Sequence, residues 1–160
     1  MNFADLAGKA GLAPMAGITD AAFRLLCYEQ GAAFCVSEML SAKGWILAGG
    51  RNRAARQLIR CLPGEGVGGL QLFGREPEYI ACAAAELSDA GYAFIDLNFG
   101  CPAPKIAGSG EGSALLREPK LLGAIVRAAV DATRLPVSAK IRSGWDETSI
   151  NAPEIARIIE

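Results

Sequence analysis

Short apolar segments alternate with helical segments along the whole chain, and this alternation constrains the fold more than any other feature. Apolar runs that suit strands occupy residues 10–15, 32–37, 67–73, 93–98 and 136–142. Segments that suit helices occupy 20–30, a stretch within 41–61, 76–90, 118–133 and 151–160. Strands that alternate with helices form parallel sheets, so the pattern predicts five consecutive βα units.

The ends of these segments carry the residues that begin and end helices. Thr19 or Asp20 is placed to cap the first helix, and Gly31 follows its end. Proline stands in the first turn of the helices at 76–90 and 118–133. Asn151 and Glu154 have the spacing of a capping box, which predicts the start of the last helix.

Length and composition favour one globular α/β domain. The chain has 160 residues, of which 51% are hydrophobic and 21% charged. A complete eight-stranded βα barrel needs about 200 residues or more, so five units are too few to close one. The formal net charge is −1, which gives no support for a strongly electrostatic nucleic-acid binder. Histidine is absent, which excludes imidazole acid–base chemistry within this chain.

Cysteine usage and hydropathy predict a cytoplasmic chain with reduced thiols. The five cysteines include no C-x-x-C pair, so neither a disulfide framework nor a metal site is expected. Neither a signal peptide nor an apolar run of 18 residues is visible, so no membrane segment is expected. Four of the cysteines fall in predicted helices or strands and are interpreted as small buried side chains. They are Cys27, Cys35, Cys61 and Cys82.

Polar or unusual residues stand near the carboxyl end of almost every predicted strand, where parallel sheets carry their chemistry. These residues are Pro14 to Gly17, Glu38 and Met39, Gln71, Asn98 with Cys101, and Lys140 with Arg142. Their convergence predicts a functional site at this edge of the sheet.

Cys101 is the strongest candidate for a reacting group. It follows Asn98 on a loop between Gly100, which permits unusual backbone turns, and Pro102, which restrains the next segment. A thiol held on such a loop can act as a nucleophile or a proton donor. A small buried cysteine is the alternative.

Two cations and two amides supply binding groups. Lys140 and Arg142 point to the same face of their strand, which suggests an anionic ligand or an electron-rich ring, although a lysine reaching solvent is the alternative. Gln71 and Asn98 can each donate and accept hydrogen bonds, which suits a base edge or a flavin ring, and structural caps are equally possible. Asp96 shares a face with Asn98 and is expected to be an inward structural carboxylate.

Two further segments allow more than one interpretation. Residues 108–113 resemble a phosphate loop only loosely and are expected to form a flexible active-site loop. An arginine cluster is favoured as a solvated face, with contact to a polyanion such as RNA as the alternative. Three of its members share a face if the segment is helical, and the cluster is Arg51, Arg53, Arg56 and Arg60.

Taken together, these motifs resemble the tRNA-dihydrouridine synthases, closest to their bacterial B-type branch. The matching segments appear in the family's order over essentially the whole chain: 12–20 (LAPMAGITD), 37–39 (SEM), 71–74 (QLFG), 95–102 (IDLNFGCP), 112–116 (GSALL) and 136–146 (PVSAKIRSGWD).

The resemblance implies an activity, cofactors and residue roles. The family reduces uridine in tRNA to 5,6-dihydrouridine with FMN and NADPH, placing hydride from the reduced flavin on C6 and a proton from a cysteine on C5. Cys101 matches that proton donor. Asn98 matches the amide that holds the uracil, and Arg142 is a nearby candidate for substrate. The matches to the flavin-binding positions are Pro14, Met15, Ala16, Gln71 and Lys140.

The resemblance also implies how much of the family's architecture the chain represents. The family has a complete TIM barrel followed by a helical tRNA-binding domain, so residues 1–160 are expected to be the N-terminal part of the FMN-binding barrel. The remaining strands, the phosphate side of the flavin site and the helical domain are expected to be absent. Two alternatives stay open: a flavin barrel acting on a free pyrimidine, of dihydroorotate type, and an inactive truncated remnant.

Overall fold

A parallel sheet organises residues 2–160, which the computed structural model describes. Within these residues the strand order is β1–β3–β4–β5, and the short strand β2 pairs with β3. All pairings are parallel. The strands are β1 (Cys35–Val36), β2 (Leu40–Ser41), β3 (Gly68–Phe73), β4 (Phe94–Phe99) and β5 (Val137–Ile141).

Helices connect the strands, as the alternation predicts, except between β1 and the short β2. The α-helices are α1 (Ala21–Glu29), α2 (Ala42–Leu47), α3 (Arg53–Leu58), α4 (Pro77–Glu86), α5 (Pro104–Ala107), α6 (Pro119–Ala132) and α7 (Ala152–Ile159). Short 3-10 helices are η1 (Phe3–Leu6), η2 (Leu87–Asp89) and η3 (Gly112–Arg117). Among residues 2–160, no helix combines the length and apolar character needed to cross a membrane.

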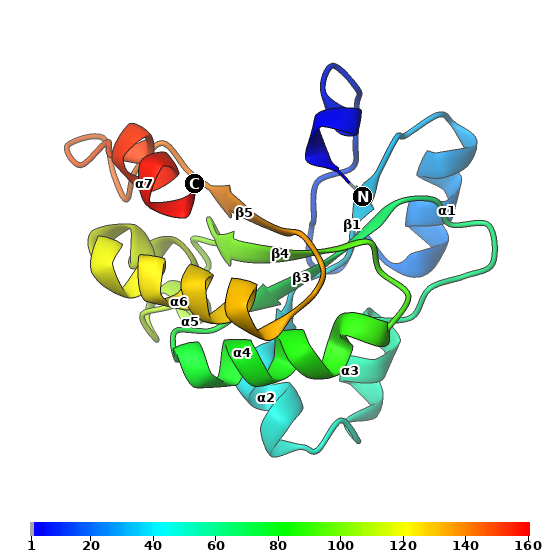
Figure 1. The fold of residues 1–160 in the computed structure, drawn as a ribbon, viewed down its shortest axis with the longest axis horizontal. Helices are drawn as coiled ribbons and strands as arrows, with labels where there is room; N and C mark the ends of the chain where they lie inside the picture. Colours follow the sequence, from blue (N-terminus) through cyan, green and yellow to red (C-terminus); the bar gives the residue numbers. More distant parts are fainter. Residues whose placement is uncertain (1) are drawn as a thin grey trace.

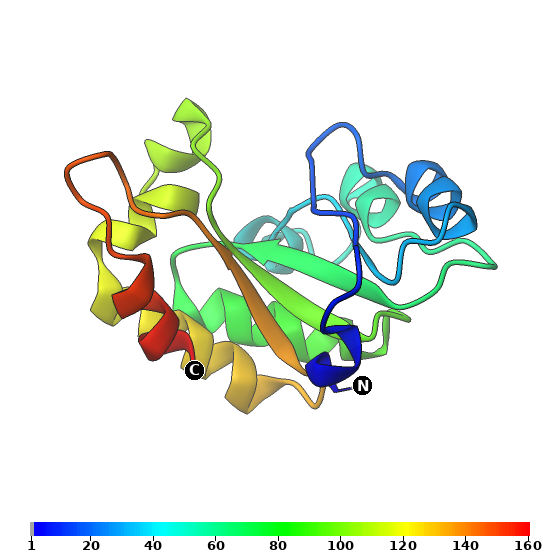
Figure 2. The same cartoon turned by 90° about the horizontal axis from the view of Figure 1, so that it is seen from above.

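The sheet is curved, and its two faces differ. Helices α4 and α6 lie along its convex side, whereas η1 and the segment that follows it lie on the concave side (Figures 1 and 2). Parallel strands in sequential order, curled with helices outside, are the arrangement of a TIM barrel. The described chain therefore forms part of such a barrel, and its concave face corresponds to the barrel interior.

The period of two along each strand sorts side chains between these faces. In β4, Ile95, Leu97 and Phe99 are fully buried and belong to the core beneath the helices. The intervening Asp96 and Asn98 are buried polar residues on the opposite, concave face. One strand thus builds both the apolar core and part of a polar interior.

The predicted first strand is shorter than expected. Residues 10–15 run beside β1, where the Leu12 N–H donates to the Phe34 carbonyl and the Leu12 carbonyl accepts from the Val36 N–H, at 2.9 and 3.0 Å. Only an isolated bridge between Leu12 and Cys35 results. Pro14 has no N–H to continue the ladder, so the chain leaves the sheet at that point.

Two other expectations about helices hold only in part: helices form within 41–61, and the last helix begins directly after Asn151. The segment 41–61 holds two short helices, α2 and α3, because Gly49 and Gly50 turn the backbone with φ of 54° and 65° between them. Asn151 does not form a capping box: its side chain makes no capping bond and instead donates to the Leu116 carbonyl at 2.7 Å. This contact fastens the start of α7 to η3.

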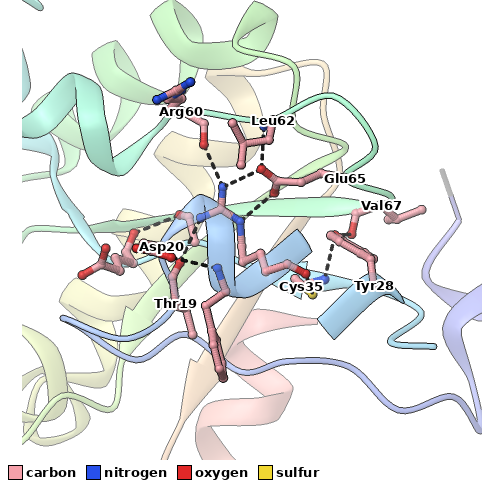
Figure 3. A network of polar contacts seen from close by, with 12 residues as sticks. Thr19, Asp20, Tyr28, Cys35, Arg60, Leu62, Glu65 and Val67 are labelled. Atoms are coloured by element: carbon pink, nitrogen blue, oxygen red, sulfur yellow. Dashed lines mark hydrogen bonds and ion pairs between the residues drawn. The ribbon is translucent and has the colours of Figure 1, made fainter. Parts of the chain in front are cut away.

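A buried ion pair closes the amino-terminal side of the domain. Arg24 of α1 is fully buried, and its Nε lies 2.8 Å from a carboxylate oxygen of Glu65. The same guanidinium donates to the carbonyls of Thr19 and Arg60 at 2.9 and 2.8 Å, and Glu65 also accepts from the Leu62 N–H (Figure 3). The pair therefore joins α1 to the turn at Thr19 that precedes it and to the segment 60–65 that follows α3.

Candidate active site

The carboxyl ends of β3, β4 and β5 bring predicted site residues together. In the sheet register Gln71 is paired with Asp96, and Asn98 is paired with Lys140. Side chains at paired positions of neighbouring strands point to the same face, here the concave one. Register alone therefore aligns an amide, a carboxylate and a lysine along the barrel interior.

A cleft of about 230 Å³ opens at this edge of the sheet. Seven of the eight predicted site residues line it: Pro14, Ala16, Gln71, Asn98, Cys101, Lys140 and Arg142. Met39, which stands among the predicted strand-end residues without an assigned role, completes the lining together with Gly100 and Pro102 of the Cys101 loop. Their positions directly after strands β1 and β4 were the available signal.

Met15 is the predicted site residue that does not line this cleft. Its backbone N–H and carbonyl both bond the Thr19 hydroxyl, at 3.1 and 3.2 Å, and its side chain is 39% exposed. Glu38 accepts a 2.5 Å bond from the Gly17 N–H. These contacts hold the loop that carries Pro14 and Ala16 against the cleft.

A continuous set of hydrogen bonds links the polar side chains beneath the cleft. Gln71 Nε2 donates to Asp96 Oδ2 at 2.6 Å, and Asn98 Nδ2 donates to Gln71 Oε1 at 2.9 Å. Ser138 donates to the other oxygen of Asp96 at 2.6 Å. The inward structural role expected for Asp96 is therefore observed, and Gln71 and Asn98 are oriented by their neighbours.

The environment of Asp96 acts on its ionisation in two directions. Burial raises the pKa of Asp96 above its ordinary value, and this effect outweighs the others. The bonds from Ser138 and Gln71, together with the charge of Lys140, pull the pKa of this carboxyl downward. Asp96 thus holds protons more tightly than an exposed aspartate, although donors surround it.

Cys101 lies half-buried on the loop that follows β4. Its backbone N–H donates to Asn98 Oδ1 at 2.9 Å, and its carbonyl accepts from the Ser113 N–H at 3.0 Å. Gly112 packs so closely that a Cβ there would lie 2.6 Å from the Cys101 carbonyl oxygen. The loop is therefore held from both sides while the thiol remains at the cleft.

The other cysteines differ from their expected burial in two cases. Cys35 is buried and Cys27 is partly buried, as interpreted, but Cys61 and Cys82 are exposed. Cys82 occupies the outer side of α4, and Cys61 follows α3 outside any element. None of these four lines the cleft.

Two cations extend from β5 into the cleft. Lys140 and Arg142 are exposed, and within residues 2–160 neither forms an ion pair. Ammonium and guanidinium groups without a carboxylate partner are available to an anionic or electron-rich ligand. The donor set of the cleft therefore suits the ring of a flavin, whose reduced form carries negative charge that a nearby cation stabilises.

The remaining sequence candidates lie elsewhere. In segment 108–113, Gly112 and Ser113 are buried and brace the Cys101 loop, so this segment does not form a phosphate cradle over the cleft. All members of the arginine cluster are exposed, in keeping with a solvated face. Arg60 lies beyond the end of α3, so the expected common helical face is wrong.

Metal ligation finds no support in the described residues. Across residues 2–160, no three side chains among His, Cys, Asp and Glu gather closely enough to hold an ion.

The fold and the cleft define this chain as part of a βα barrel with its site at the carboxyl ends of the strands. Sequence comparison then identifies the family: a family model described as dihydrouridine synthase (Dus) matches residues 11–160. The chain belongs to this family.

Several curated relatives match nearly the whole chain. The tRNA-dihydrouridine synthase B of Proteus vulgaris is 42% identical over 150 residues, which cover 92% of this chain and 45% of the relative. A probable tRNA-dihydrouridine synthase of Rickettsia bellii is 41% identical over 157 residues, covering 98% and 47%. The tRNA-dihydrouridine synthase B of Xanthomonas axonopodis pv. citri is 41% identical over 157 residues, covering 97% and 46%. The chain thus spans about half the length of the curated relatives it matches.

Proposed function

We propose that this chain supplies the catalytic half-site of a tRNA-dihydrouridine synthase, which reduces uridine in tRNA to 5,6-dihydrouridine. The observation that carries the proposal is the cleft itself, where a loop thiol, an oriented amide and a free lysine converge at the strand ends. Membership of the dihydrouridine synthase family and the names of the relatives support the same activity.

The cofactor in this proposal is FMN, with NADPH as reductant. Lys140 and Gln71 face the ring, and Pro14, Met15 and Ala16 border it through the first loop. When bound, the reduced flavin supplies the two electrons that saturate the C5–C6 bond. Lys140 fits this role because its ammonium is exposed in the cleft and forms no ion pair among residues 2–160.

Cys101 is the proton donor in the proposed reaction. It holds a proton on Sγ and delivers it to C5 of the base, and the thiolate is then reprotonated from solvent. The two bonds to its backbone, from Ser113 and to Asn98, fix the loop, so the thiol is held in position before the substrate arrives.

The substrate contacts are assigned to Asn98 and Arg142, and the macromolecular partner is tRNA. Among the lining residues Asn98 is buried and Arg142 is exposed, so Asn98 is assigned to the base and Arg142 to the base or a phosphate. A uridine must leave its stack to reach this depth, as in other enzymes that modify bases.

The test is deletion of the gene that encodes this chain, followed by mapping of dihydrouridine along each tRNA. Loss of dihydrouridine at one or more positions is expected. Restoring the gene with Cys101→Ala should leave those positions unmodified, whereas Cys82→Ala, which removes an exposed cysteine outside the cleft, should restore them. An unchanged map after deletion, or full restoration by Cys101→Ala, contradicts the proposal.

A further inference from the structure

A chain of hydrogen bonds runs from the Cys101 loop into the sheet. The backbone N–H groups of Gly100 and Cys101 donate to Asn98 Oδ1 at 3.2 and 2.9 Å. Asn98 Nδ2 donates to Gln71 Oε1 at 2.9 Å, and Gln71 Nε2 donates to Asp96 Oδ2 at 2.6 Å. The two amide links are buried, so a missing partner there leaves a polar group unpaired, and the links to the loop are partly buried.

The backbone end of this hydrogen-bond chain dictates its direction. Backbone N–H groups can only donate, so the Asn98 atom that meets them is its carbonyl oxygen. The NH₂ group of Asn98 then faces Gln71, whose carbonyl accepts, and the NH₂ group of Gln71 faces Asp96. At the far end Asp96 Oδ2 accepts from Gln71 Nε2, which agrees with this direction. Reversing either amide would leave two acceptors or two donors in contact.

This direction determines what the cleft offers to a ligand. The carbonyl oxygens of Asn98 and Gln71 are both occupied, and each amide keeps one further N–H. For Asn98 the only other partner among residues 2–160 is Met39 Sδ at 3.8 Å, a weak acceptor. The remaining polar side chains of the lining are Lys140, Arg142 and Cys101, and the two cations are donors. The free side-chain groups of the cleft are therefore donors.

We propose that Asp96 is a positioning residue that orients Asn98 through Gln71, so that Asn98 selects a carbonyl oxygen over an amino group on its ligand. Naming the base rests on the proposed function. Uracil presents a carbonyl oxygen where cytosine presents an amino group, so the oriented amide accepts the first base and rejects the second. Asp96 itself touches neither substrate nor the reacting atoms.

Two linked substitutions test the direction of the hydrogen-bond chain. Asn98→Asp alone places a carboxylate oxygen against Gln71 Oε1, so two acceptors are in contact while Gln71 Nε2 remains directed to Asp96. Adding Asp96→Asn supplies an amide donor at the far end of the hydrogen-bond chain. The Gln71 amide can then flip, so that its oxygen accepts from position 96 and its NH₂ group donates to position 98. The carboxylate introduced at position 98 therefore presents an acceptor to the cleft. Ser138→Ala is the matched control, because it removes a bond to Asp96 while leaving the carboxylate in place.

The measurement is the ratio of dissociation constants for uridine 5′-monophosphate and cytidine 5′-monophosphate, obtained by ligand-observed NMR. In the wild type, the uridine nucleotide is expected to bind about tenfold more tightly or better, since an amino group opposite Asn98 leaves two donors in contact. Ser138→Ala should keep this ratio. In the double variant the preference should move to the cytidine nucleotide.

Defined outcomes overturn the inference. Equal affinities in the wild type, no binding of either nucleotide, or an unchanged uridine preference in the double variant would each do so. If the double variant does not fold, Asp96→Ala alone decides: it removes the acceptor that holds Gln71 Nε2, so the uridine preference should fall, and an unchanged ratio overturns the inference. Failure of the proposed function is separate, because it is seen as an unchanged dihydrouridine map whatever the nucleotide ratio.

Discussion

The buried pair between Arg24 and Glu65 provides the sharpest test of how this domain is held together. Only 1% of the Arg24 side chain and 6% of the Glu65 side chain are exposed. Arg24→Met removes the cation while retaining most of the buried volume, so Glu65 keeps a desolvated carboxylate without its partner. The carbonyls of Thr19 and Arg60 lose their guanidinium donor in the same step.

The expected loss of unfolding free energy is about 3–5 kcal/mol, the range for breaking a buried pair by removal of one partner. At about 2–4 °C per kcal/mol for a domain of this size, the melting temperature should fall by about 10 °C. The assay is urea unfolding followed by tryptophan fluorescence, because Trp45 lies in the core and becomes exposed on unfolding.

An exposed ion pair in the same chain supplies the control. Lys43 and Glu76 lie 2.6 Å apart with side chains 45% and 28% exposed, so Lys43→Met should leave the unfolding free energy nearly unchanged. Combining Arg24→Met with Glu65→Gln should recover part of the loss, because a neutral amide is less costly to bury than an unpaired carboxylate. A loss for Arg24→Met no greater than for Lys43→Met would refute the reasoning.

Three further predictions concern the site. Gly112→Ala should displace the Cys101 loop and cost more than about 1 kcal/mol, since it combines a φ of 57° with a 2.6 Å contact to the Cys101 carbonyl oxygen. Gly91→Ala, at φ 89° with open space around its Cβ position, measures the backbone effect alone in the same thermal melt, and equal losses would contradict the packing argument. Lys140→Met should weaken FMN binding by about tenfold or more in a fluorescence titration, and unchanged affinity would remove this residue from the ring site. Burial raises the pKa of Asp96 in the folded state above the unfolded pKa of about 3.9. The contribution of Asp96 to stability is therefore fully present below the unfolded pKa and is lost as the pH rises through the folded pKa. The wild type should thus gain stability relative to Asp96→Asn when the pH falls from 7 toward 4. Parallel pH profiles in urea melts would contradict it.

Most of the architecture could be predicted from local sequence pattern. Helices α4 and α6 and strands β3 and β4 fall within or next to their predicted ranges, because apolar periodicity, proline and glycine mark them locally. The errors arose where a single residue outweighed the pattern. Pro14 ended the first strand, and the Gly49–Gly50 pair divided one expected helix.

The gathering of site residues was also predictable, since parallel strands place their carboxyl ends at one edge. The partners of those residues were not. Asn151 has the spacing of a capping residue, but its side chain donates to the Leu116 carbonyl. Cysteine is a residue type that is usually buried, but Cys61 is exposed. Spacing along the chain carries no information on which distant group will satisfy a polar side chain.

The sequence by itself determined the βα alternation, the shared faces of Asp96 with Asn98 and of Lys140 with Arg142, and the set of residues at the strand ends, because these depend on short-range periodicity. Only the tertiary structure decided how those residues are oriented. Gln71 meets Asp96 25 positions away, and Arg24 meets Glu65 41 positions away. Burial favours such contacts, because a polar group removed from water without a partner costs free energy, and the tertiary packing determines which partner is within reach.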